Sequence, residues 1–209
     1  MLTEIYPSLF LLREESPGAP SQFVYLLRYG TGVALFGTKA DLSAHFAELS
    51  ALGRITHVLL GDRHHVTEHT ALLAKHFDVP ISASEIEASA LRGITVGAIV
   101  PFRRTQIMPG LEAIPTPGHT RGALSFLWTR KGRRFLFVGD TIVPIDGEWH
   151  YWVSKANRAI MRESMRQLAT LDADVILSNS FAATPKAWVE VSPLARAQLF
   201  AGLDRRLAP

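Results

Sequence analysis

The chain contains no cysteine among its 209 residues. Disulfide scaffolds, thiolate zinc clusters and cysteine nucleophiles are therefore excluded, and a metal site would need histidine, aspartate, glutamate or backbone oxygens. No apolar run approaches the ~20 residues of a membrane-spanning helix. The N-terminus carries Glu4 where a secretory signal has lysine or arginine. The sequence thus predicts a soluble protein of the cytoplasm without a membrane partner.

The chain also has no stretch of linker composition and no strong net charge, and it is not poor in apolar residues. A domain usually has about 100–200 residues, so the length and the 47% apolar residues predict one globular domain over residues 1–209. The net charge is +3, and the basic residues cluster at 103–104, 130–134 and 205–206. No aromatic residues alternate with them to stack bases. A solvated surface is the preferred interpretation, and nucleic-acid binding is the minority alternative.

Strand patterns dominate both halves of the chain. The β-rich runs 21–29 and 32–36 predict a hairpin, and the apolar run 55–60 predicts a strand buried on both faces. Two strand-rich halves with few helices predict an α+β fold, in which two sheets pack face to face with helices outside. Further strands are expected at 81–83, within 96–138 and at 174–177, and helices at 42–52, after Thr67 and at 154–171.

Polar segments follow three of the predicted strands at the point where each strand ends. The first segment, 62–69, is rich in carboxyl and imidazole groups, as metal sites are. The other two hold His119 and Asp140. Residues at strand ends share one rim, where sites are usually built. The alternatives are a capped turn or helix start for 62–69, a turn with its imidazole bonded to backbone for His119, and an Asx turn for Asp140.

Two of these segments resemble the metallo-β-lactamase-fold superfamily. Ile114-Pro-Thr-Pro-Gly-His119-Thr-Arg-Gly-Ala-Leu is similar to that family's T-P-G-H-T-x-G-S segment, and Phe135-Leu-Phe-Val-Gly-Asp140-Thr to its L-F-x-G-D segment. The resemblance extends from Phe23 to about Ser180. It implies a four-layer αβ/βα sandwich with a metal site at the sheet edges.

The resemblance is weaker at the remaining ligand positions. Asp62 and His64 fall on the first two ligand positions of the family's H-x-H-x-D-H segment, whereas Val66 and Thr67 fall where the ligands of a second metal stand. Gly37 and Ser180 fall, respectively, at the aspartate of the I-D-T-G segment and at the family's last histidine. The first motif looks more like a divergent branch in which a further histidine follows. That would add His69, with His65 as the alternative in a shifted register.

The resemblance therefore implies one metal ion held by Asp62, His64 and His119, with Asp140 as a fourth or bridging ligand and His69 as a further candidate. Zinc is expected. Manganese and iron are alternatives, because two carboxylates with two imidazoles form a harder donor set than three imidazoles.

The expected activity is hydrolysis of a small-molecule ester, thioester, amide or phosphoester by metal-activated water. Asp140 and His150 are the expected catalytic residues. His150 lies in the aromatic stretch 148–152, which would wall the substrate pocket or, alternatively, pack its tryptophans on the sandwich edge. A non-catalytic relative whose altered site binds a ligand or partner is the alternative function. A nuclease is a third possibility.

Overall fold

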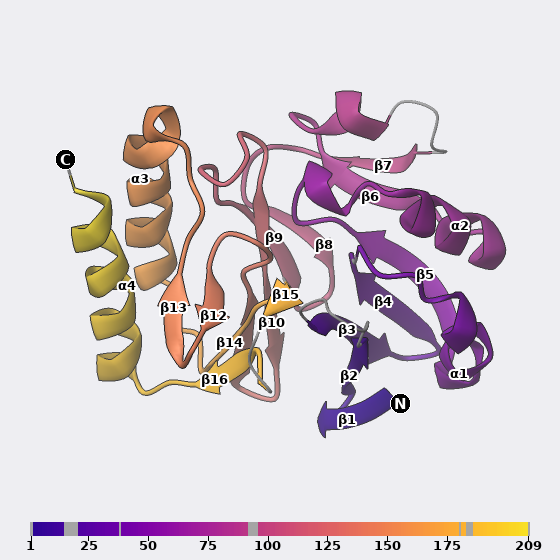
Figure 1. The fold of residues 1–209 in the computed structure, drawn as a ribbon. Coiled ribbons are helices and arrows are strands. Elements are labelled where there is room, and N and C mark those ends of the chain that lie inside the picture. The colour runs from indigo at the N-terminus through magenta and orange to yellow at the C-terminus, as the bar shows by residue number, and fades with distance from the viewer. Residues whose placement is uncertain are drawn as a thin grey trace.

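The protein is described by a computed structural model that covers residues 2–14, 21–37, 39–91, 96–179, 181–182 and 186–208. Two β-sheets lie face to face, and helices cover the outer face of each sheet (Figure 1). One sheet has eight strands and the other six. This arrangement confirms the predicted α+β sandwich of four layers.

The N-terminal sheet changes from antiparallel to parallel at its centre. The strands before β4 pair antiparallel, and those from β4 to β7 pair parallel. Helices α1 and α2 connect the parallel strands on the outer face. The bounds are β1 Leu2–Tyr6, β2 Leu9–Glu14, β3 Ser21–Tyr29, β4 Gly32–Phe36, α1 Phe46–Leu52, β5 Arg54–Leu59, α2 Glu68–Phe77, β6 Ile81–Ser84, β7 Val96–Val100 and, beside β3, β15 Phe181–Ala182.

The C-terminal sheet has the order β16-β14-β11-β10-β9-β8, with α3 and α4 on its outer face. Strands β11 and β14 are parallel, and β9 runs in the same direction because both β9 and β11 pair antiparallel with β10. The bounds are β8 Thr105–Met108, β9 Leu111–Pro115, β10 Leu124–Arg130, β11 Arg133–Phe137, β14 Val175–Leu177, β16 Trp188–Glu190, α3 Arg158–Ala169, α4 Pro193–Leu207 and, in a separate hairpin, β12 Val143–Ile145 and β13 Glu148–His150.

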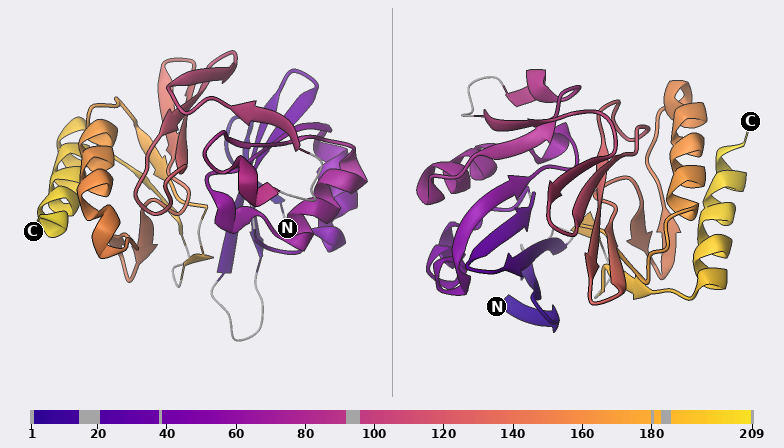
Figure 2. Two further views of the ribbon diagram at one scale, coloured as in Figure 1. Left: turned by 90° about the horizontal axis from the view of Figure 1, so that it is seen from above. Right: turned by 180° about the vertical axis from the view of Figure 1, so that it is seen from behind.

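Apolar side chains fill the three spaces between the four layers. Between the sheets, Phe36 of β4 stacks on Phe137 of β11 with ring centroids 4.0 Å apart. Leu35 and Leu49 belong to the cluster under α1 and α2, and Met161 belongs to the one under α3 and α4. Figure 2 shows from above that both sheets lie between these helix pairs. Alternation along strands such as β4 thus supplies both the inner and the outer core.

Two elements of the second half differ from expectation. Helix α4 is not among the predicted helices, although Ser192 caps it by accepting a hydrogen bond from the Ala195 amide. The aromatic stretch 148–152, for which no strand was predicted, contributes β13. The helix expected at 154–171 is largely confirmed, as a 3-10 turn at Lys155–Asn157 followed by α3. Among the described residues, no helix combines the length and apolar character that a membrane span requires.

The carboxyl ends of β4, β5, β9, β11 and β14 meet at one rim, where backbone and side-chain hydrogen bonds join the sheets. The Leu124 amide donates to the Gly61 carbonyl oxygen at 2.7 Å, and the Asn179 side-chain amide donates to the Gly37 carbonyl oxygen at the same distance. The first bond joins β10 to a residue after the β5 end, and the second joins the segment after β14 to the residue after β4, so each connects the two sheets. The rim is therefore a fixed platform for the side chains that follow these strands.

Gly118 fits this rim only because it has no side chain. Its φ is +148°, and an added Cβ would lie 2.6 Å from Met161 Cβ and 2.8 Å from Met161 Cα. Helix α3 fixes both atoms, so we expect Gly118→Ala to lower the free energy of unfolding by about 2–4 kcal/mol. Gly132→Ala, in open space at φ +79°, should cost only about 1 kcal/mol. Denaturant unfolding measures both, and equal losses would contradict the packing argument.

Candidate metal centre

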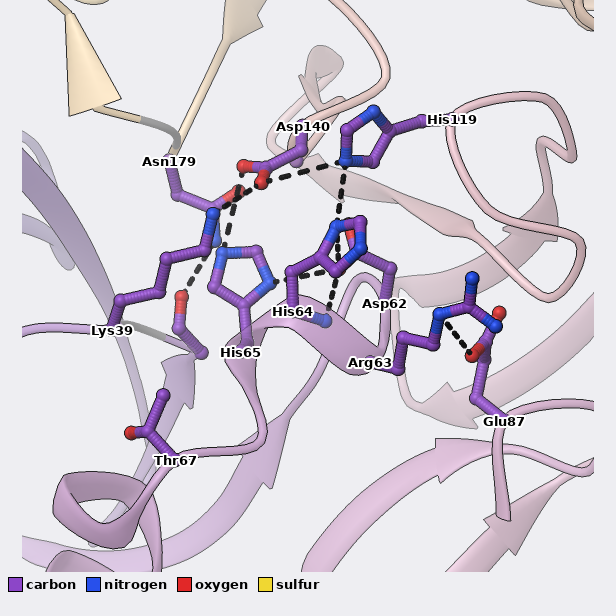
Figure 3. Close-up of polar contacts among 12 residues, drawn as sticks. Lys39, Asp62, Arg63, His64, His65, Thr67, Glu87, His119, Asp140 and Asn179 are labelled. Carbon is purple, nitrogen blue, oxygen red and sulfur yellow. Dashed lines mark hydrogen bonds and ion pairs between the residues drawn. The ribbon is translucent and has the colours of Figure 1, made fainter. Parts of the chain in front are cut away.

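Four of the expected metal ligands converge at the rim between the sheets. Asp62 and His64 follow β5, His119 follows β9 and Asp140 follows β11. One potential ligand atom from each lies within 4.8 Å of every other. Figure 3 shows the four side chains gathered together. The group therefore draws on both sheets and three strand ends.

Asp62 and His64 are oriented by a local turn. The backbone of Asp62 is extended, and its carboxylate accepts a hydrogen bond from the His64 amide at 2.7 Å, which caps the 3-10 turn Arg63–His65. The turn leaves His64 exposed and buries His65 against the sheets. An aspartate at this position therefore serves both as a helix cap and as a candidate ligand.

His119 has one ring nitrogen committed to the backbone. Its Nδ1 lies 3.0 Å from the Trp152 carbonyl oxygen, which can only accept, so Nδ1 carries the proton. Nε2 then faces the group, 2.9 Å from His64 Nδ1 and 3.8 Å from Asp140 Oδ2. The backbone bond that was considered as an alternative to metal binding is present. It is the kind of bond that orients a metal-binding imidazole.

Asp140 is the most buried acid of the group, with 2% of its surface exposed. Burial would raise its pKa, but the charges of His65 and Lys39 and a hydrogen bond from Lys39 together lower the pKa to about 2. Lys39 Nζ lies 2.7 Å from Asp140 Oδ2. Oδ1 is buried without a hydrogen-bond partner among the described residues. Asp140 is therefore a carboxylate at neutral pH with an unused oxygen.

His64 is held in the neutral form that metal binding needs. Although 43% of its side chain is exposed, partial burial of the imidazole is the main effect that lowers its pKa, and the nearby His119 and Lys39 act in the same direction against the opposing effect of Asp62. A metal ion competes with protons for imidazole nitrogens, so a lowered pKa favours binding near pH 7.

The residues present fit a single metal ion. The ligands of a tetrahedral zinc ion lie about 3.3 Å from one another, and the His64 and His119 nitrogens are 2.9 Å apart. Small side-chain rotations would bring the whole group, which spans at most 4.8 Å, to that spacing. The unused Asp140 oxygen also fits such a ligand, because a buried polar atom without a partner is costly.

Three other histidines were considered as site residues. His65 is buried between the two carboxylates, with Nδ1 3.8 Å from Asp62 Oδ1 and Nε2 3.6 Å from Asp140 Oδ1. The structure does not place His69 in the group: it lies on α2, with Nδ1 3.9 Å from Asp41. His150 lies on β13, 4.0 Å from Glu148 of the same strand. It is not part of the four-residue group found among the described residues.

The positions that depart from the family pattern have structural reasons. Thr67 caps α2, since its hydroxyl accepts a hydrogen bond from the Thr70 amide at 3.2 Å. A Cβ at Gly37 would lie 2.5 Å from Leu60 Cδ2 and 3.2 Å from the Leu59 carbonyl oxygen, so a side chain there would have to displace the Leu60 side chain. Ser180 lies outside the described residues.

Sequence reasoning missed Lys39 and Glu87. Glu87 is buried, accepts the Gly122 amide hydrogen bond at 2.7 Å, and lies 3.9 Å from Arg63 Nε. It thus connects the turn that carries His64 to the loop that carries His119. Neither residue belongs to a recognisable motif. Both contact the site through residues that are distant in the sequence, so only the folded structure identifies them.

The family follows from the sequence and the structure together. The Metallo-beta-lactamase superfamily profile matches residues 57–178, which is more than half of the chain. The chain belongs to the metallo-beta-lactamase superfamily. The matched region contains all four residues of the candidate metal centre.

Solved metallo-beta-lactamases share the fold. The MIM-2 metallo-beta-lactamase is 18% identical with a TM-score of 0.70, covering 96% of this chain and 86% of that one. A B3 metallo-beta-lactamase described as having an active site glutamic acid is 19% identical with a TM-score of 0.67, covering 97% and 86%. A metallo-beta-lactamase family protein from Thermus thermophilus has the same identity and TM-score, covering 97% and 80%. No curated protein sequence matches the chain.

Loss of Glu87 should loosen the His119 loop. In Glu87→Ala the Gly122 amide loses its acceptor, so we expect faster hydrogen exchange at that amide and a stability loss of about 1–3 kcal/mol. Glu85→Ala is the matched control, because the exposed Glu85 accepts a hydrogen bond from the Phe102 amide, away from the His119 loop. Unchanged protection of Gly122 in Glu87→Ala would refute the role assigned to Glu87.

Proposed function

We propose that the protein is a metal-dependent hydrolase with a one-ion centre formed by Asp62, His64, His119 and Asp140. The convergence of these side chains, together with the partnerless buried oxygen of Asp140 among the described residues, is the observation that supports it. Zinc is the expected ion, with manganese or iron as alternatives for two carboxylates and two imidazoles. When bound, the ion polarises a carbonyl or phosphoryl oxygen and makes water nucleophilic at neutral pH.

The protein's own groups would orient the reactants. Asp140, with its pKa lowered to about 2, is too weak a base to retain a proton at neutral pH. A carboxylate oxygen of Asp140 that the ion leaves free would be better suited to accept a hydrogen bond from the attacking water and so to orient it. The Trp152 carbonyl oxygen fixes the ring of His119 through Nδ1. His150 remains a predicted proton donor, from the hairpin next to Trp152.

The substrate is proposed as a small ester, thioester, amide or phosphoester. Several proteins with this fold are metallo-beta-lactamases, so the amide class in a screen should include a β-lactam. One of them is described as having an active site glutamic acid, which is a precedent for an acidic residue in the active site of this fold. A location in the cytoplasm and the lack of a nucleic-acid partner stay part of the proposal.

Removal of His119 tests the metal centre. We expect about one ion per chain in the unmodified protein after equilibration with zinc or manganese and desalting, and none retained in His119→Ala, because one of four ligands is lost. Elemental analysis gives the ratio. His69→Ala and His150→Ala are matched controls and should keep the ion. Retention by His119→Ala would refute the assigned ligand set.

Turnover tests the hydrolase itself. The metal-loaded protein should hydrolyse at least one chromogenic member of the four substrate classes, and His119→Ala should lose that activity by a factor of about 100 or more. His150→Ala separates its predicted role: a loss of kcat with the ion retained would support proton donation. A protein that holds the ion but turns over no class would favour the non-catalytic alternative, in which the site binds a ligand or partner.

A further inference from the structure

Lys39 brings a positive charge into the centre from the N-terminal sheet. It lies just after β4, and its ammonium reaches Asp140, which follows β11 of the other sheet, at 2.7 Å. The Lys39 side chain is 26% exposed, so it enters from the surface, whereas the carboxylate is buried. Figure 3 shows Lys39 on one side of Asp140 and His119 with His64 on the other. Asp140 thus lies between two positions that each favour a cation.

The His65 imidazole lies on the same side of Asp140 as Lys39 and makes few hydrogen bonds. His65 Nε2 lies 3.6 Å from Asp140 Oδ1, and His65 Nδ1 is buried without a hydrogen-bond partner among the described residues. The residues at the neighbouring positions do not add a ligand. Val66 has none, and the hydroxyl of Thr67 accepts the Thr70 amide at the start of α2. On this side, the Asp140 carboxylate and the His65 imidazole lie close together, and the cation beside them is the Lys39 ammonium.

Charge counting sets a limit on how many ions the centre holds. Asp62 and Asp140 are both buried carboxylates, and one divalent ion neutralises the pair. Lys39 already places a further positive charge beside Asp140. A second divalent ion would leave a large excess of positive charge beside these two buried carboxylates, which is unfavourable.

We propose that Lys39 takes the place of a second metal ion and thereby limits the centre to one ion. The inference rests on the proposed one-ion centre and deepens it. Without metal, the ammonium compensates Asp140 and stabilises the buried carboxylate. With metal, the same ammonium repels the ion across the carboxylate that both share. Lys39 therefore stabilises the metal-free protein and weakens metal binding. A Lys39 side chain that only filled space would not produce both effects.

The test replaces Lys39 by residues of different charge. Lys39→Met keeps the length and removes the charge, and Lys39→Glu reverses the charge and adds a carboxylate ligand. Lys39→Arg is the matched control that keeps the charge, and Lys75→Met, on the exposed side of α2, controls for the change in net charge. Zinc stoichiometry is measured by elemental analysis, zinc affinity by competition with a chromogenic chelator, and the melting temperature on the metal-free protein.

We expect about one zinc ion in the unmodified protein, Lys39→Arg and Lys75→Met, and about two in Lys39→Glu. Lys39→Met should melt at a lower temperature without metal and should bind its ion about tenfold more tightly. An unchanged or weaker affinity in Lys39→Met, or a single ion in Lys39→Glu, would overturn the inference while leaving the one-ion centre intact. No ion in the unmodified protein would instead overturn the proposed function, and this inference with it.

Discussion

The buried carboxylate of Asp140 is the group on which the rest of the centre depends. A charge with 2% exposure is unfavourable unless compensating groups surround it. Lys39, His65 and His119 all direct nitrogens toward it, from the ends of β4, β5 and β9. The low pKa of Asp140 is the result of this surrounding positive potential. The position of each neighbouring residue can be understood from the need to keep this carboxylate ionised.

Such a site requires two sheets that cannot slide past each other. Parallel pairing directs the strand ends to one rim, and hydrogen bonds from the Leu124 and Asn179 amides connect the sheets there. Gly37, which follows β4, also lies close to Leu60, which follows β5 of the same sheet, and an added Cβ there would displace the Leu60 side chain. The stacked rings of Phe36 and Phe137 lie in the apolar layer between the sheets. Packing of the core therefore fixes the distances between groups that come from remote parts of the sequence.

The sequence was sufficient to predict the sandwich and the convergence of strand ends, because both depend on local patterns. Continuous apolar and aromatic runs define β3 and β4, and the polar segments at His119 and Asp140 directly follow apolar strands. The first motif was harder to interpret. The sequence alone does not distinguish the roles of His64, His65 and His69. In the structure, the 3-10 turn capped by Asp62 places His64 in the four-residue group and buries His65, whereas His69 lies on α2.

Lys39 could not be identified from the sequence because its role depends on a contact between sheets. It is one of 22 basic residues, and no motif marks it as different from those on the surface. The same limit applies to Glu87, whose carboxylate accepts the hydrogen bond of the Gly122 amide, 35 positions further along the chain. Residues that act through contacts between distant segments become visible only when the segments are placed in space.

The charged residues around the candidate ion balance one another electrostatically. Asp62 in place of a first imidazole adds a negative charge to the ligand set, and Lys39 adds a positive charge on the opposite side of Asp140. The two changes offset each other, so a one-ion centre has the same net charge as one with three imidazoles and a single carboxylate. Asp62 and Asp140 alone would balance one divalent ion, so the centre with Lys39 carries one positive charge in excess. An effective dielectric constant well below that of water strengthens the repulsion of a further ion beside these buried carboxylates. The aspartate of the first motif and the lysine after β4 therefore both determine how much further positive charge the centre can hold.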